Sequence, residues 1–333
     1  MRPPGRPVRG LRTWSDQRAE RVLGALACGV LVLIAGMIAF VFSKAWPSFA
    51  HNGVHWFGGG GNVDRQLGDI FNSPANPKHY VYTLHAWPLL YGTAITTLGA
   101  VLIGLTFSVL SAVFIVEFAP AQLKRVLEPV VRLLAAVPSV VYGLIGVLVL
   151  VPFVGNHLIS EHQKRSVQFV VQLSGSSLLV AVLILTVMIT PIMVAIVVDA
   201  LRAVPSSWTE GSAALGVNRW RTMWSISVRT ARPAIVAAAV LATARALGEA
   251  IMLSMVSGSV GFAPNPLDGI TFFVEPTRPL AATIVDNAEG LSVKPFGQTI
   301  YAFAAVLLVS SMFLSFGGWA AKQPLKRYGA AIA

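Results

Sequence analysis

Long apolar runs, separated by polar connections, dominate the pattern of this sequence. A helix that crosses a membrane needs roughly 20 mostly apolar residues, and six windows meet that length. We therefore predict six transmembrane helices. Their predicted bounds are Val22–Phe42, Ile95–Val116, Leu133–Val154, Leu178–Val198, Ala234–Val256 and Thr299–Ala320.

The first apolar run follows a basic tail, as the apolar core of a signal peptide does. The run is longer than the roughly 7–15 residues of such a core, so we predict a retained helix. Composition supports a membrane protein: 55% of the residues are hydrophobic and 12% are charged, whereas soluble domains carry about 25% charged residues. The single cysteine, Cys28, excludes an internal disulfide framework. The predicted fold class is an all-α integral membrane protein.

Lysine and arginine are unevenly shared between the two sides of the predicted membrane. With the N-terminus inside, 17 of the 25 lie in the tails and the inner connections, and seven lie outside. The positive-inside rule then places both termini in the cytoplasm. This distribution explains the net charge of +11 without nucleic acid as a partner.

The outer connections are long, and all six histidines lie in them. His51 and His55 have the spacing of a helical metal pair, but Gly53 separates them and no acidic residue accompanies them, so we predict no metal site and no cofactor. The sequence shows no internal repeat, which gives no support to an inverted-repeat transporter. Pro138 and Pro191 interrupt the third and fourth spans. Ordinary kinking explains Pro191, whereas Pro138 stands beside Ser139, Tyr142 and Gly143, which indicates a break where polar groups and close packing meet.

The inner connection between spans four and five predicts a rigid corner. Ser207 and Glu210 have the spacing of a capping box, so a short helix is expected from Trp208 to Leu215, ended by Gly216. Asn218 then caps an interfacial helix, and Pro233 opens the fifth span at its first helical position. None of the seven lysines follows a glycine, so a P-loop is absent and ATP hydrolysis requires a separate chain.

Arg245 and Glu249 are two charges inside the fifth apolar run. Counted from Pro233, Arg245 lies roughly 18 Å along the helix, where an arginine facing lipid costs about 2.5–3.5 kcal/mol. At a spacing of four the two side chains share one helix face and can pair. One interpretation is a salt bridge that fixes helix packing. The other is an anion site, in which Arg245 binds phosphate or sulfate oxygens and Glu249 prevents overly tight binding.

Part of the inner corner resembles the "EAA" motif of bacterial ABC importer permeases. Glu210-Gly-Ser-Ala-Ala-Leu-Gly216, followed after nine residues by Ile226, keeps the motif's register, although Gly211 and Ser212 replace two alanines and Val228 and Arg229 replace Leu-Pro. The resemblance implies a loop that docks into the ATPase subunit. It makes Glu210, Ala213, Ala214 and Gly216 the predicted ATPase-coupling residues.

Two further segments, "RALGE" with "SGSVGF" and "VPSVVYGLIGVLVLVP", resemble the phosphate-importer permeases of the PstC type. This resemblance covers roughly residues 92–320. It implies the type I ABC importer fold, the bacterial inner membrane, and phosphate passing Arg245 and Glu249. The implied partners are a second permease (PstA type), an ATPase dimer (PstB type) and an external phosphate-binding protein (PstS type).

The predicted organisation is a tail (1–21), a first helix with a long outer loop (22–91), a permease core (92–320) with its coupling loop (202–233), and a basic tail (321–333). Two other functions remain open. One is a sulfate or molybdate permease of the same class, because arginine alone does not distinguish tetrahedral anions. The other is a secondary anion transporter or channel with Glu249 as a proton relay. The spans carry no obvious catalytic constellation, which disfavours a membrane enzyme.

Overall fold

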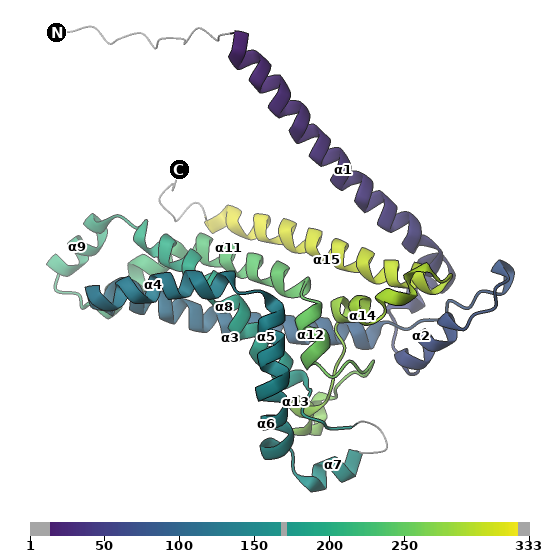
Figure 1. The fold of residues 1–333 in the computed structure, drawn as a ribbon. Coiled ribbons are helices and arrows are strands. Elements are labelled where there is room, and N and C mark those ends of the chain that lie inside the picture. Colours follow the sequence, from purple (N-terminus) through teal and green to yellow (C-terminus); the bar gives the residue numbers. More distant parts are fainter. Residues whose placement is uncertain (1–13, 168–171, 326–333) are drawn as a thin grey trace.

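The computed structural model describes residues 14–167 and 172–325 as an all-helical chain (Figure 1). Within these residues the β pairing is limited to one isolated bridge, between Gly258 and Thr277. The predicted tails lie partly outside the described residues, as do Arg2, Arg6, Arg9, Arg12, Lys326 and Arg327. The helices are α1 (Trp14–Asn52), α2 (Val63–Phe71), α3 (Trp87–Val113), α4 (Ala121–Ala136), α5 (Ser139–Ile145), α6 (Val151–Phe153), α7 (Glu161–Val167), α8 (Leu178–Arg202), α9 (Ser206–Ala214), α10 (Arg219–Thr222), α11 (Val228–Leu247), α12 (Ile251–Val256), α13 (Thr271–Val274), α14 (Leu280–Asp286) and α15 (Phe296–Leu325).

Six helical runs in the described residues are long and apolar enough to cross a membrane, which confirms the predicted number. Two of the predicted bounds are wrong. The third run is Ser139–Leu158 rather than Leu133–Val154, and the fifth is Arg219–Leu247 rather than Ala234–Val256. A break in the chain, which the apolar pattern crosses without interruption, explains the later start of the third run and the earlier end of the fifth. The early start of the fifth run has a different cause, since its first helix continues into the span.

Short π-helical turns join several of these helices into longer runs. They cover Gly146–Leu150 and Val154–Leu158, which extend α5 and α6, and Met223–Ser227, which joins α10 to α11. A π turn inserts an extra residue into the helical ladder without ending it. The third span is therefore one helical run after its break, and the fifth begins at Arg219.

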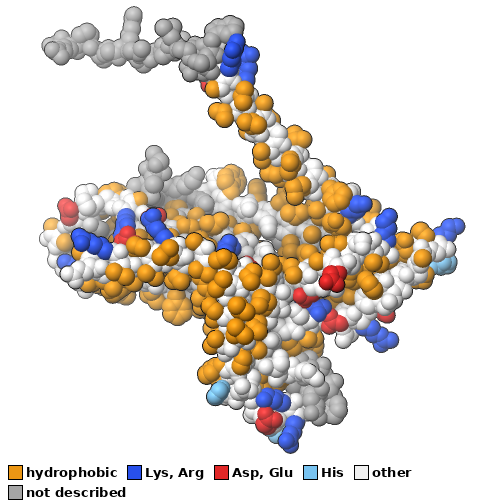
Figure 2. Space-filling model, viewed as in Figure 1, with side chains coloured by type: hydrophobic (Ala, Val, Ile, Leu, Met, Phe, Trp, Pro, Cys, Tyr) orange, Lys and Arg blue, Asp and Glu red, His pale blue; other side chains and the backbone are white. Residues whose placement is uncertain are grey.

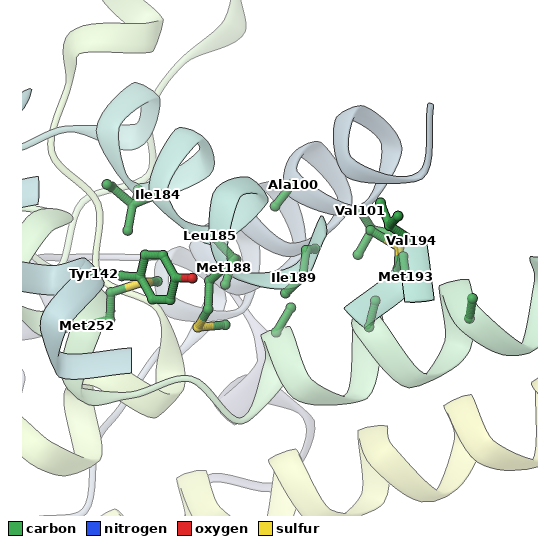
Figure 3. Close-up of a cluster of buried hydrophobic side chains, with 14 of the residues drawn as sticks. Ala100, Val101, Tyr142, Ile184, Leu185, Met188, Ile189, Met193, Val194 and Met252 are labelled. Atoms are coloured by element: carbon green, nitrogen blue, oxygen red, sulfur yellow. The ribbon is translucent and has the colours of Figure 1, made fainter. Parts of the chain in front are cut away.

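The main core lies where α3, α8 and α11 pack together (Figure 3). Ala238, Ala242 and Ala246 recur every fourth residue on α11 and are all buried. Small residues at this spacing let two helix backbones approach closely in a membrane. From α8, the fully buried Met188 and Met193 fill the remaining space. Close packing of small against flexible side chains thus holds the centre of the bundle together.

Helix α1 differs from the rest of the bundle. It rises away from the other helices (Figure 1), and none of its apolar 18-residue window is buried. Hydrophobic side chains cover α1 and the run from α5 to α6 in the space-filling view (Figure 2). A second apolar cluster, which includes Trp56, Leu89 and Phe303, ties the end of α1 to α3 and α15. These exposed apolar faces suit a lipid or protein environment inside a membrane.

Candidate transport pathway and coupling corner

The fifth apolar run contains a break between α11 and α12. Helix α11 ends at Leu247, where the N–H of Gly248 donates to the Ala244 carbonyl (3.3 Å) and the N–H of Glu249 donates to the Ala246 carbonyl (3.2 Å). Helix α12 starts again at Ile251. The prediction of one continuous helix over 234–256 is therefore wrong, because the chain turns within 248–250.

Arg245 and Glu249 consequently do not share a helix face, and that part of the prediction is wrong. Glu249 is 8% exposed, and its Oε1 accepts a hydrogen bond from the N–H of Met252 (3.3 Å) at the start of α12. Among the ion pairs of residues 14–167 and 172–325, none joins Arg245 to Glu249. The carboxylate lies inside the break, while the guanidinium of Arg245 is exposed on the last turn of α11.

The third span has a matching break at Val137 and Pro138. Helix α4 ends at Ala136, and α5 begins at Ser139 with Pro138 as its N-cap residue. Across the break, the Tyr142 hydroxyl donates to the Leu134 carbonyl (2.9 Å). The predicted break at Pro138 is confirmed, whereas Pro191 lies inside the continuous helix α8. We call the two breaks the proline elbow (Val137–Pro138) and the charged elbow (Gly248–Ala250).

The two elbows meet through the helices that follow them. Tyr142 lies beside Met252 in the core (Figure 3) and within electrostatic reach of Arg245. A Cβ added to Gly143 would lie 3.2 Å from the Met252 Cα and 3.0 Å from the Met255 sulfur. A glycine is therefore needed for α5 to approach α12 this closely. The sequence indicated close packing near Pro138 but not that the partner would be the segment after Glu249.

One side of the charged elbow borders an apolar cavity of about 510 Å³ between α1, α14 and α15. Leu247 and Gly248 line this cavity, whereas neither Arg245 nor Glu249 does. The side chain of Arg245 forms no hydrogen bond or ion pair with the residues that the structure describes. The N–H donors of the Arg245 guanidinium are therefore not used by other described residues. Paired donors of this kind bind the oxygens of an oxyanion.

The inner corner between α8 and α10 has the predicted glycine turn. Gly216 has φ +73°, and its N–H donates to the Ala213 carbonyl (2.9 Å) while the N–H of Val217 donates to the Ser212 carbonyl (3.2 Å). These two bonds and the left-handed residue form the Schellman arrangement that ends α9. Asn218 caps the next helix, as predicted, by accepting from the N–H of Arg221 (2.8 Å).

Three local predictions in the inner corner are wrong. Helix α9 starts at Ser206 with Pro205 as N-cap and no side-chain cap bond, so Ser207 and Glu210 form no capping box. The helix begins there because the proline already fixes the preceding backbone. The helix after Asn218 is not a separate interfacial helix but the start of the fifth run, Arg219–Leu247. Pro233 accordingly lies inside α11 rather than at its first position.

The predicted coupling residues lie together on the protruding corner. Glu210, Ala213 and Ala214 on α9 are exposed, and so is Gly216. Ser212, one of the departures from the EAA pattern, is buried and its Oγ lies 2.8 Å from the Thr222 Oγ1. This hydrogen bond holds α9 against α10. The serine that replaces the motif's alanine therefore stabilises the packing of α9 on α10. It does not alter the exposed face of α9.

Metal ligands are not gathered anywhere in the described residues, which contain no group of three or more His, Cys, Asp or Glu side chains placed to hold an ion. His51 lies in the last turn of α1 and His55 in the short helix Gly53–Phe57. The two residues therefore do not share a helical face.

A membrane bundle of six spans with a protruding helical corner defines the class as a polytopic transport permease. Residues 104–321 match the family described as the inner membrane component of binding-protein-dependent transport systems. The chain belongs to that family and is the multi-pass permease subunit of an ABC importer.

Three relatives illustrate the likeness. A probable ABC transporter permease protein, YqgH of Bacillus subtilis, is 34% identical and the match covers 89% of each chain. A probable phosphate transport system permease protein, PstC of Methanocaldococcus jannaschii, is 32% identical over 69% of this chain and 70% of its own. The phosphate transport system permease protein PstC 1 of Mycobacterium tuberculosis is 31% identical over 93% of both.

Solved structures share the fold. A bacterial alginate ABC transporter, in complex with an alginate-bound periplasmic protein, superposes with a TM-score of 0.58 at 12% identity, covering 96% of this chain and all of that one. The MetNI methionine ABC transporter superposes with a TM-score of 0.51 at 16% identity, covering 72% and 96%. At these identities the likeness concerns the arrangement of helices.

Proposed function

We propose that this chain forms the phosphate pathway of an ATP-driven importer, within a core that spans residues 92–320. The observation that carries the proposal is the exposed guanidinium of Arg245 at the charged elbow. The planar guanidinium of an arginine binds phosphate through two parallel N–H donors. The phosphate-permease names of several relatives support this choice of anion.

Glu249 has a different part in this proposal from Arg245. Its carboxylate caps the start of α12 and is buried, so it supplies a fixed negative charge behind the site rather than an ion pair in front of it. A nearby like charge weakens the binding of an anion. Glu249 therefore keeps phosphate from binding so tightly that it cannot leave.

The exposed face of α9 supplies the coupling surface. Glu210, Ala213, Ala214 and Gly216 lie on it, and Leu215 at its end is 84% exposed. An apolar side chain this exposed suits a pocket on a partner protein. The proposed partner at this face is one of two ATPase subunits (PstB type). A second permease (PstA type) lies alongside, and an external phosphate-binding protein (PstS type) meets the two long outer connections, 43–94 and 257–298.

The proposed cycle follows the alternating access of an importer. ATP-driven closure of the ATPase dimer moves α9 and opens the pathway outward. Phosphate then leaves the binding protein, passes Arg245 and is released inside. Arg245 lies on the last turn of α11, beside the charged elbow. Membrane proteins tolerate irregular backbone of this kind where it lines a pathway.

Uptake of radiolabelled phosphate into a permease-null strain tests this function. We expect the wild-type gene to restore uptake, unlabelled sulfate and molybdate to compete poorly, and a protonophore to leave ATP-dependent uptake intact. Glu210→Ala should lower uptake by roughly tenfold, the effect of losing one charge-assisted contact, while Ser207→Ala on the same helix should not. Strong competition by sulfate would indicate that sulfate, rather than phosphate, is the substrate. Uptake that a protonophore abolishes and that does not need the ATPase would indicate a secondary transporter.

A further inference from the structure

We propose that Glu128 and Arg202 form the link that carries movement of the coupling helix α9 to the two elbows, so that they are positioning residues for transport. This inference rests on the proposed function, since it concerns how ATP hydrolysis reaches the phosphate pathway. The two residues are 74 positions apart in the sequence, and nothing in the sequence pattern pairs them.

The pair joins two helices by two parallel contacts. Arg202 is the last residue of α8, and its Nη1 donates to the Glu128 Oε2 on α4 (3.1 Å). Its Nη2 forms a second, shorter contact with the Glu128 Oε1. This fork-on-fork arrangement fixes direction as well as distance. The hydrogen bond from Arg202 lowers the pKa of Glu128, as expected for a carboxylate whose ionised form is stabilised by the pair.

Helix α4 packs mainly against α8. None of its residues is buried, and its apolar contribution to the core comes from the partly buried Leu127 and Val131. A helix that packs mainly against one neighbour is expected to follow the movement of that neighbour. The two-pronged contact with Arg202 is therefore the strongest polar tie between α4 and the helix that leads to α9.

Other charges surround the pair. A water-sized cavity of about 20 Å³ between α4 and α8 is lined by Glu128, Arg132, Asp199 and Arg202. Positive and negative groups therefore alternate around one small space. With two arginines and two carboxylates around this space, α4 can shift along α8 and each charge can still face one of opposite sign.

Both ends of the link are short. Arg202 is separated from the start of α9 at Ser206 by three residues, the last of which is Pro205, so a movement of α9 is transmitted to α8 with little slack. At the far end of α4, the Leu134 carbonyl accepts the Tyr142 hydroxyl across the proline elbow. Tyr142 in turn lies within electrostatic reach of Arg245. The contacts thus run from the coupling corner to the proline elbow, close to Arg245.

Charge reversal tests the link in the complete importer, reconstituted in liposomes with its second permease, ATPase and binding protein. The measured quantity is inorganic phosphate taken up per ATP hydrolysed. Glu128→Arg and Arg202→Glu should each lower this ratio at least fivefold while ATP hydrolysis continues. The double reversal should restore it to within twofold of wild type, because the two charges again attract each other.

The Glu161 and Lys164 pair on α7 provides a matched control, since it is also an ion pair (2.8 Å) and partly exposed. Reversing both of its charges should leave the ratio unchanged. Single reversals at 128 and 202 that keep the wild-type ratio would overturn the link, as would a double reversal that assembles normally yet stays as low as the singles. A wild-type complex that hydrolyses ATP without taking up phosphate would instead contradict the proposed substrate. In that case the measured quantity would be the stimulation of ATP hydrolysis by the binding protein. The link predicts that the single reversals lower this stimulation and that the double reversal restores it.

Discussion

The proline elbow and the charged elbow both interrupt an apolar run, but the polar groups that they contain differ. Each follows a helix that packs beside α8, and each is followed by a segment that turns in the same direction (Figure 1). The proline elbow satisfies its own polar groups, since the Tyr142 hydroxyl donates to the Leu134 carbonyl. The charged elbow contains a buried carboxylate and leaves the guanidinium of Arg245 without a partner among the described residues.

The two elbows therefore differ in whether they have hydrogen-bond donors left to bind an anion. The proline elbow needs no ligand, because the Tyr142 hydroxyl and the Leu134 carbonyl already bond to each other. An arginine left open in an apolar bundle is costly unless something pairs with it during function. We therefore assign anion passage to the charged elbow and the positioning of its neighbour to the proline elbow. The following variants test whether the two elbows really differ in this way.

The largest expected effect comes from separating the elbows. A Cβ at Gly146 would lie 2.6 Å from the Val256 Cγ1 and 3.3 Å from the Ile184 Cγ1, so Gly146→Leu forces α5 away from α12. Overpacking of this kind costs about 1–3 kcal/mol. We expect the thermal unfolding midpoint in detergent to fall by roughly 5 °C and phosphate uptake to be lost.

Gly36→Leu is the control for that variant, because no atom lies within 4 Å of a Cβ added at Gly36 on the exposed face of α1. Its unfolding midpoint should match that of the wild type. If Gly146→Leu also unfolds at the wild-type temperature and transports normally, α5 and α12 do not need to touch.

A smaller effect is expected at Glu249, where charge and capping can be tested separately. Glu249→Gln keeps an oxygen that can accept from the Met252 N–H but removes the charge. We expect phosphate to bind more tightly and leave more slowly, with a lower KM and a several-fold lower maximal rate of uptake. Glu249→Ala also removes the cap and should lose about 1 kcal/mol of stability in addition. Equal uptake kinetics for Glu249→Gln and wild type would mean that Glu249 is a cap alone.

The smallest effect is expected at the proline elbow. Tyr142→Phe removes the hydroxyl that donates to the Leu134 carbonyl and keeps the ring beside Met252. The net value of such a hydrogen bond is about 0.5–1.5 kcal/mol. We expect a slightly lower unfolding midpoint and an unchanged KM for phosphate, because the ring and not the hydroxyl occupies the core. A large rise in KM would show that the Tyr142 hydroxyl contacts the anion itself.

The two candidate regions differed in how much the sequence could predict. At the inner corner, Gly216 and Asn218 each bond to a backbone group three residues away, so their residue types alone indicated a glycine turn and a new helix. The same local logic failed for Ser207, because Pro205 had already started the helix. Local signals were sufficient where a short segment decides its own conformation.

The charged elbow has no such local signal. Gly248 has φ −84° and Ala250 has φ −109°, which any residue adopts, and no proline stands in the segment. The chain breaks there because α12 packs against α5, a contact that depends on tertiary structure. The bond from the Met252 N–H to Glu249 is local, but a glutamate three residues before an amide is too common in helices to predict a break. The sequence therefore predicted which residues carry charge in the fifth span but placed them on one continuous helix.

The most direct test of the central claim is phosphate uptake by the Arg245→Gln importer, with ATP hydrolysis and complex assembly measured in the same samples. Arg232→Gln, which removes an exposed arginine from the same helix α11, is the matched control. We expect Arg245→Gln to assemble and hydrolyse ATP while its uptake falls by roughly tenfold to a hundredfold, the loss of one charged donor pair, and Arg232→Gln to transport normally. Uptake by Arg245→Gln at the wild-type rate would show that phosphate does not pass this residue and would contradict the proposed pathway.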